Sequence, residues 1–253
     1  MPVKFFSLIS KAGAFTRLMI ISILIAVTGC SDGGDDDGIR TIVCFGDSIT
    51  EGMSAVTVGV ADKTKSYPAY LQEKVSAIVI NSGVSGDATT DANLRAETDL
   101  YMYDPDVAVI CLGANDIFDA SLPAIVSGTA VKTIRANLTR YITRLDDSDR
   151  LIFIAKFYSE QSARDVMAAR GGVTDPAIQT AVIKSLDDMF DSIAGMSTSR
   201  AKVILIDNIW DDVWGTSGMS SDGIHPAASG YEIMADNYFR SMESYLEDIG
   251  LLK

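Results

Sequence analysis

The stretch TIVCFGDSITEG, residues 41–52, joins an apolar run to a group of small polar residues. Its first half is β-branched and continuously apolar, which is typical of a strand covered on both faces of a sheet. Its second half contains Gly46, Asp47 and Ser48, residue types that form turns and helix caps. The stretch therefore predicts a buried parallel strand that ends in a turn, with Ser48 where a helix begins.

Four more apolar runs follow at long intervals, and amphipathic stretches lie between them. The runs are AIVIN (77–81), VAVICLG (107–113), LIFIAKF (151–157) and KVILIDN (202–208). The amphipathic stretches cover residues 66–77, 129–145, 175–196 and about 227–248, and Asp175 followed by Pro176 is a good helix start. A repeated strand–helix order predicts one α/β domain, a three-layer α/β/α sandwich around a five-stranded parallel sheet.

The N-terminus has the composition of a targeting segment. Residues 1–29 contain three basic residues and no acid, and the apolar run LMIISILIAVTG ends just before Cys30. This run is too short for a membrane-spanning helix with stop-transfer flanks. The ending VTGC resembles a bacterial lipobox, which implies cleavage before Cys30 and acylation of that cysteine. We therefore expect a signal peptide at 1–29, an acidic flexible spacer at 30–39 and a folded domain at 40–253.

The expected location is the cell envelope, with a membrane anchor at Cys30 rather than a spanning helix. A serine directly after Cys30, Ser31, resembles the sorting pattern of bacterial outer-membrane lipoproteins, so the outer membrane or the periplasmic face is the expected place of the anchor. The formal net charge is −13, and loss of three basic residues with the signal peptide would make it −16. Such an acidic chain would repel phosphate backbones, so we expect no nucleic-acid partner. Cys44 and Cys111 lie in apolar runs and are expected to be buried hydrophobes.

Small polar residues follow four of the five apolar runs. They are GDSITEG after the first, NSGVSGDAT after the second, GANDIFD after the third and SSDGIHPAASG beyond the fifth. The carboxyl ends of parallel strands meet at one edge of a sheet, and ligands bind there. The last segment holds His225, the single histidine of the chain.

These residues suggest nucleophilic catalysis. A serine hydroxyl needs a base to remove its proton, so a nucleophilic Ser48 would depend on His225, and Asp222 could orient the imidazole. The developing oxyanion needs donors, for which the candidates are the Ser48 N–H, the Gly86 N–H and the side-chain amide of Asn115. Each residue also has an ordinary alternative: a helix cap for Ser48, turn positions for Gly86, Asn115 and Asp222, and a surface imidazole for His225.

The segments GDSIT, NSGVSGD, GAND and DGIHP resemble the four sequence blocks of the SGNH (GDSL) hydrolase family, in the same order. The resemblance implies a flavodoxin-like fold, Ser48 as nucleophile, Asp222 and His225 as the rest of a triad, and Gly86 and Asn115 as oxyanion donors. It implies a serine esterase or acylhydrolase that works through an acyl-enzyme. Thr50 stands where an α/β-hydrolase elbow has its second glycine, so that scaffold is not indicated.

Neither a cofactor nor a metal is expected. The chain has one histidine and no paired cysteines, which makes a zinc-hydroxide mechanism improbable. It contains neither a G-x-G-x-x-G motif nor a Walker A motif, which argues against a nucleotide cofactor. Asp47 and Asp116 flank the catalytic candidates, and we expect them to hold loops in place by hydrogen bonds.

The substrate is less well defined by the sequence. Small or lipid-like carboxylic esters, lysophospholipids among them, are the first expectation. Acetylated glycans of the envelope or the diet are the alternative, and a ligand-binding lipoprotein without turnover is a third. Apolar residues expected near the site are Met53, Ile117, Phe118, Tyr158, Trp214 and Met219. Residues 159–174 could form a lid or a surface helix and loop, and their composition leaves both open.

Overall fold

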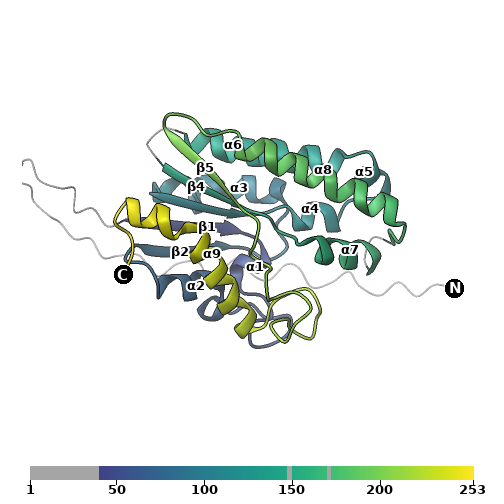
Figure 1. Ribbon diagram of the computed structural model, residues 1–253, viewed down its shortest axis with the longest axis horizontal. Coiled ribbons are helices and arrows are strands. Elements are labelled where there is room, and N and C mark those ends of the chain that lie inside the picture. Colours follow the sequence, from purple (N-terminus) through teal and green to yellow (C-terminus); the bar gives the residue numbers. More distant parts are fainter. Residues whose placement is uncertain (1–39, 147–149, 170–171) are drawn as a thin grey trace, which may run out of the picture. The chain divides into compact units, whose positions relative to one another are not determined.

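The computed structural model describes residues 40–146, 150–169 and 172–253 (Figure 1). The predicted signal peptide, Cys30 and the predicted spacer lie outside the described residues.

In the described part of the chain, five parallel strands form one sheet in the order β2-β1-β3-β4-β5. The strands are β1 (Thr41–Gly46), β2 (Ile78–Gly83), β3 (Val107–Cys111), β4 (Arg150–Ala155) and β5 (Ala201–Ile206). All five overlap the predicted apolar runs, so the predicted fold class is confirmed. Connections from β1 lead outward to β2, whereas those from β3 onward lead to the other edge. The strand order therefore reverses between β1 and β3, where α/β sheets bind ligands.

Helices cover both faces of the sheet (Figure 1). The first face carries α2 (Tyr67–Gln72) and α9 (Ala228–Asp248), which pack against each other. The second face carries α3 (Thr89–Asp99), α6 (Thr129–Leu145) and α8 (Pro176–Ala194). Shorter elements are α1 (Ser48–Glu51), η1 (Lys63–Lys65), η2 (Tyr101–Tyr103), α4 (Ala114–Phe118), α5 (Leu122–Val126) and α7 (Glu160–Ala169).

The four predicted amphipathic stretches are helical, although α2 ends five residues before its predicted limit. Helix α3 was not predicted, because its buried side chains are small and its sequence is largely polar. One expectation about the strands was wrong. The run at 77–81 was expected to be covered on both faces, but β2 is an edge strand and Ile78 is 47% exposed. Cys44 and Cys111 are buried free thiols, as expected.

The turn after β1 packs tightly against its neighbours because two glycines lack a Cβ. A Cβ on Gly46 would lie 1.9 Å from the Oγ1 of Thr50 and 2.8 Å from the carbonyl oxygen of Cys111. A Cβ on Gly83 would lie 2.2 Å from the backbone nitrogen of Glu51. Helix α1 can therefore rest directly on the carboxyl ends of β1 and β2, which places its first residue, Ser48, at that edge.

Asp47 caps this short helix from a buried position. Its side chain is 1% exposed, and Oδ1 accepts a 3.0 Å hydrogen bond from the Ile49 N–H. Oδ2 meets no hydrogen-bond donor among the described residues. Burial raises the pKa of Asp47 to about 7, the Ile49 N–H opposes the rise, and the carboxylates of Asp87 and Asp116 add to it. The fold thus favours the protonated form of this cap.

Ionisation of Asp47 should weaken the fold. A carboxyl whose pKa is raised on folding contributes its stability at low pH, and this is lost as the pH rises from about 4, the unfolded value, to about 7. Asn caps helices as well as Asp does and carries no charge. We therefore compare the free energy of unfolding of Asp47→Asn with that of the wild type, measured with urea. The difference in favour of the variant should grow by on the order of 2 kcal/mol as the pH rises from about 4.5 to about 8.

Asp119→Asn is the matched control, because Asp119 is exposed and its replacement removes the same charge. An equal pH response of the two variants would contradict the effect assigned to Asp47.

Candidate active site

Ser48, His225 and Asp222 form a continuous chain of hydrogen bonds. The Oγ atom of Ser48 lies 3.0 Å from Nε2 of His225, and Nδ1 of His225 lies 2.9 Å from Oδ2 of Asp222. Ser48 is the first residue of α1, and the other two residues belong to the loop before α9. Residues 177 positions apart in the sequence are therefore in direct contact. The arrangement allows the imidazole to accept the serine proton on one side while the carboxylate orients it on the other.

The Asp222 carboxylate is held by its own loop. Oδ1 accepts hydrogen bonds of 2.9 Å from the backbone N–H groups of Ile224 and His225, and Gly223, between Asp222 and Ile224, has a φ of 72°. Oδ2 accepts a 2.6 Å bond from the Ser54 hydroxyl. Burial alone would raise the pKa of Asp222, but the Ser54 hydroxyl, the two N–H groups and the imidazole together lower it below the ordinary aspartate value. Asp222 therefore stays a carboxylate at working pH.

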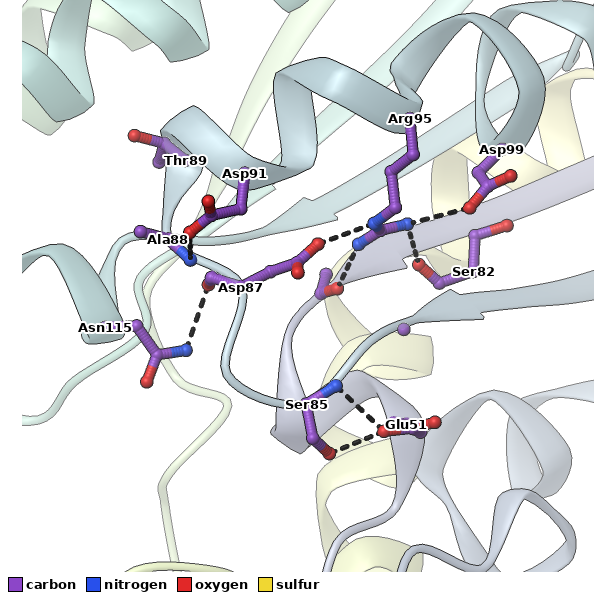
Figure 2. Close-up of polar contacts among 12 residues, drawn as sticks. Glu51, Ser82, Ser85, Asp87, Ala88, Thr89, Asp91, Arg95, Asp99 and Asn115 are labelled. Carbon is purple, nitrogen blue, oxygen red and sulfur yellow. Dashed lines mark hydrogen bonds and ion pairs between the residues drawn. The ribbon is translucent and has the colours of Figure 1, made fainter. Parts of the chain in front are cut away.

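Gly86 lies in the loop between β2 and α3, and Asn115 lies in α4 at the cavity that Ser48 also lines. Gly86 has a φ of 86°, a conformation that favours glycine, and its N–H makes no hydrogen bond to another described residue. Asn115 is in the first turn of α4, after β3, and its Nδ2 donates to the Asp87 carbonyl at 2.9 Å (Figure 2). That amide has a second N–H, so one contact fixes the side chain and one donor is left for a ligand.

The Arg95 side chain holds the Gly86 loop to the sheet (Figure 2). Its guanidinium pairs with Asp87 at 2.5 Å and donates 2.8 Å bonds to the carbonyls of Gly46 and Ser82. It also lies over the Phe45 ring, 4.5 Å from the ring centroid. Burial raises the pKa of Asp87, although Arg95 lowers it. One planar cation thus joins the carboxyl ends of β1 and β2 to the loop that carries Gly86.

Two further contacts fix the same loop. The Glu51 carboxylate of α1 accepts from both the N–H and the hydroxyl of Ser85, the first at 2.8 Å (Figure 2). Asp116 of α4 accepts from the N–H and the hydroxyl of Thr89, at 2.7 and 2.6 Å. As expected, Asp116 holds a loop by hydrogen bonds, whereas Asp47 caps its own helix α1. The positions of the three proposed oxyanion donors are therefore set by the surrounding contacts before any ligand binds.

An apolar cavity of about 120 Å³ opens beside Ser48 and His225. Its walls come mainly from α4, α7, α8 and the segment after β5. The apolar lining residues are Ile49, Ala114, Ile117, Phe118, Phe157, Tyr158, Ala163, Val166, Met167, Val182, Leu186, Trp210, Trp214 and Ile224. Ser48, Asn115 and His225 lie at the same cavity. Hydrogen bonds from Trp214 to Asp165 and from Tyr158 to Asp187 join the walls to α7 and α8.

Four of the six apolar residues expected near the site do line the cavity: Ile117, Phe118, Tyr158 and Trp214. Met53 and Met219 do not, and their backbones form isolated β-bridges with Ala61 and Pro226 within the segments that follow α1 and β5. The contribution of α8 to the cavity was not predicted, because its apolar residues have the spacing of a helix face that packs on a sheet. Part of the 159–174 segment is helix α7, and Ala163 and Met167 on it line the cavity.

In the described ranges, no three His, Cys, Asp or Glu side chains come together in a way that could hold a metal ion. None of the helices within residues 40–146, 150–169 and 172–253 is long and apolar enough to cross a bilayer.

Two sequence comparisons bear on the chain. The profile of the GDSL-like Lipase/Acylhydrolase family matches residues 44–233. A Bacillus subtilis (strain 168) protein, "Uncharacterized lipoprotein YqeF", is 31% identical over 109 residues, which are 40% of this chain and 40% of that protein. The match thus spans about two fifths of the length of that relative.

Solved structures share the fold. The crystal structure of TesA has a TM-score of 0.59 with 21% identity, and the match covers 81% of this chain and 99% of TesA. A family 3 carbohydrate esterase of Clostridium thermocellum has a TM-score of 0.55 with 17% identity, over 83% of this chain and 98% of that one. At these identities the likeness shows the α/β/α architecture alone. With the sequence profile matched across strands β1 to β5, the chain belongs to the GDSL-like lipase/acylhydrolase family, the SGNH hydrolases.

Proposed function

We propose that this protein is a serine hydrolase that cleaves carboxylic esters with an apolar acyl group. The observation that carries the proposal is the relay from Ser48 Oγ through His225 to Asp222, with bonds of 3.0 and 2.9 Å, at the mouth of an apolar cavity. Family membership supports ester hydrolysis as the reaction type.

In the first half-reaction, Ser48 Oγ attacks the ester carbonyl carbon while its proton moves to Nε2 of His225. This requires the tautomer in which Nδ1 carries a proton and donates it in a hydrogen bond to Asp222. The carbonyl oxygen becomes negative and accepts from the Ser48 N–H, the Gly86 N–H and the Asn115 amide. The tetrahedral intermediate then collapses, the C–O bond to the alcohol breaks, and the proton on Nε2 leaves with the alcohol.

In the second half-reaction, water replaces the alcohol. His225 takes a proton from the water as its oxygen attacks the acyl carbon of the Ser48 ester. Collapse of this second intermediate breaks the bond to Oγ, returns the proton to Ser48 and releases the carboxylic acid. Neither half-reaction uses an oxidant, a metal or a cofactor, so the described side chains suffice for the proposed chemistry.

The cavity supports an acyl group larger than acetyl. Its walls are aliphatic and aromatic, and each methylene removed from water contributes about 0.8 kcal/mol. A sugar hydroxyl placed in the same space would lose its hydrogen bonds to water without replacement. The apolar lining thus favours fatty-acyl or other apolar acyl esters over acetylated glycans, the alternative suggested by the sequence.

We further propose that the protein is attached to the cell envelope by a lipid on Cys30. Support comes from the lipobox-like ending VTGC after a basic and apolar N-terminus, and from the name lipoprotein carried by the Bacillus subtilis relative. The predicted division into a signal peptide at 1–29, a spacer at 30–39 and a hydrolase domain at 40–253 belongs to this proposal. A tether of this kind would bring the cavity close to membrane lipids, which are one source of apolar acyl esters.

Hydrolysis of p-nitrophenyl esters from acetyl to dodecanoyl tests the reaction and the acyl preference. We expect kcat/KM to rise roughly fourfold per added methylene until the cavity is filled, and then to level off or fall. Ser48→Ala should lower kcat by roughly four to six orders of magnitude. Ser121→Ala, which removes an exposed hydroxyl that makes no helix-cap bond, is the matched control and should match the wild type.

Two outcomes would contradict the proposal. Turnover that survives in Ser48→Ala would exclude Ser48 as the nucleophile. Cleavage restricted to acetyl esters, and best on acetylated sugars, would replace the acyl assignment with carbohydrate deacetylation.

Metabolic labelling with radioactive palmitate tests the anchor. The wild-type chain, expressed in a bacterium that processes lipoproteins, should carry the label and sediment with membranes. Cys30→Ser should lose both properties, because the acylated thiol is absent. Equal labelling of Cys44→Ser and wild type is expected, since Cys44 is buried in β1. Label retained in Cys30→Ser would refute the anchor.

A further inference from the structure

Ser54 is a buried serine in a backbone conformation that favours glycine. It lies three residues after the end of α1, has a φ of 61° and is 2% exposed. A glycine could adopt this φ at no steric cost, whereas a residue with a Cβ is strained there. Backbone strain of this kind persists only where surrounding contacts hold the residue in place. The contacts of the Ser54 side chain therefore indicate what the strained conformation achieves.

The Ser54 hydroxyl is bonded on both sides. It accepts a 2.9 Å hydrogen bond from the Gly59 N–H and is itself the donor to Oδ2 of Asp222 at 2.6 Å. Because the amide of Gly59 can only donate, the serine proton is committed to Asp222. That same carboxylate oxygen accepts from Nδ1 of His225 at 2.9 Å. Ser54 therefore acts on the atom through which Asp222 orients the imidazole.

Ser54 also comes from a different segment of the chain than the other donors to Asp222. The remaining donors, the N–H of Ile224 and the N–H and ring of His225, all belong to the loop of Asp222 itself. Ser54 lies 168 positions earlier, on the segment that begins with Ser48. Its bond thus ties the segment of the proposed nucleophile to the loop of the proposed base.

The backbone around Ser54 is held without its hydroxyl. The Tyr231 hydroxyl donates to the carbonyl of Met53 at 3.0 Å, and the Ala228 N–H donates to the carbonyl of Ala55 at 2.8 Å. The Ser54 N–H donates to the Val60 carbonyl at 3.0 Å. A variant that lacks only the hydroxyl should therefore keep this segment folded against α9.

We propose that Ser54 is a positioning residue that fixes the Asp222 carboxylate and, through it, aligns His225 with Ser48. The proposal rests on the proposed serine-hydrolase function. Loss of the hydroxyl has two consequences. The carboxylate loses one of its orienting bonds, which lowers the rate. Its negative charge is also less neutralised and holds the imidazolium more strongly, so His225 should lose its proton at a higher pH.

The single histidine gives a readout that does not depend on turnover. We would follow the ring signals of His225 by NMR between pH 4 and 9, on the full chain purified without a histidine tag, together with kcat and KM on the preferred p-nitrophenyl ester. Ser54→Gly removes the hydroxyl and relieves the φ strain, and Ser54→Ala removes the hydroxyl and keeps the strain. Ser66→Ala is the control, because Ser66 is also buried and bonds the Lys63 carbonyl and Asn81 instead of Asp222.

The other titratable groups near His225 and Asp222 are the same in these variants as in the wild type. Tyr231 of α9 interacts electrostatically with Asp222, with Asp47 and Glu51 of the α1 region, and with Cys111 of β3. A change in the titration of His225 that is common to both Ser54 variants therefore reports the loss of the hydroxyl.

We expect both Ser54 variants to raise the midpoint of the His225 titration and to lower kcat roughly 10–100-fold, with KM within about twofold of the wild type. Ser66→Ala should show neither effect. An unchanged midpoint or an unchanged kcat in Ser54→Gly would overturn the proposal. If the wild type hydrolyses no ester, the proposed function fails, and the midpoint in Ser54→Gly alone then decides whether Ser54 controls His225.

Discussion

The Arg95 guanidinium is the contact on which the geometry of this site depends most. Parallel strands end in a row of carbonyls with no partner beyond the sheet, and loops that start there need another source of order. Arg95 occupies this place between β1 and β2, bonds the carbonyls of Gly46 and Ser82 and pairs with Asp87 (Figure 2). The turn that leads to Ser48 and the loop that carries Gly86 are thereby fixed relative to each other. Hydrogen bonds that involve a charged group contribute about 1.5–3 kcal/mol each, enough to hold both loops in place.

The second constraint is that a single imidazole, that of His225, must contact both Ser48 and Asp222. His225 contacts Ser48 with one ring nitrogen and Asp222 with the other, so its tautomer and its direction are decided by the carboxylate. Asp222 is in turn bonded by two backbone N–H groups of its own loop and by Ser54. These donors lower the pKa of Asp222 against the effect of its burial, which keeps the charge that the imidazolium needs during the proposed reaction. Asp47, one residue before Ser48, has the opposite environment, since its burial is not offset by a comparable set of donors.

Much of this arrangement could be predicted from the sequence, because its signals are local. The apolar runs predicted the strands and their parallel pairing. The polar segments after them, through their resemblance to the family's sequence blocks, predicted a site at one edge of the sheet. Long-range partners that lie outside these polar segments could not be found this way. Nothing near Arg95 in the sequence reveals that it bonds two strand ends, and nothing near Ser54 indicates a contact 168 residues away. The cavity walls were only partly predicted for the same reason, since Val182 and Leu186 of α8 look like ordinary helix-core positions.

Covalent labelling with an alkyl p-nitrophenyl phosphonate, followed by peptide mass spectrometry, tests whether Ser48 is a nucleophile that His225 activates. We expect a single phosphonylated residue, Ser48, with stoichiometric release of p-nitrophenol. In His225→Ala the labelling rate should fall at least about a hundredfold, on the order of the contribution of a general base. Label on another residue, or an equal rate of labelling without the imidazole, would contradict this activation of Ser48 by His225.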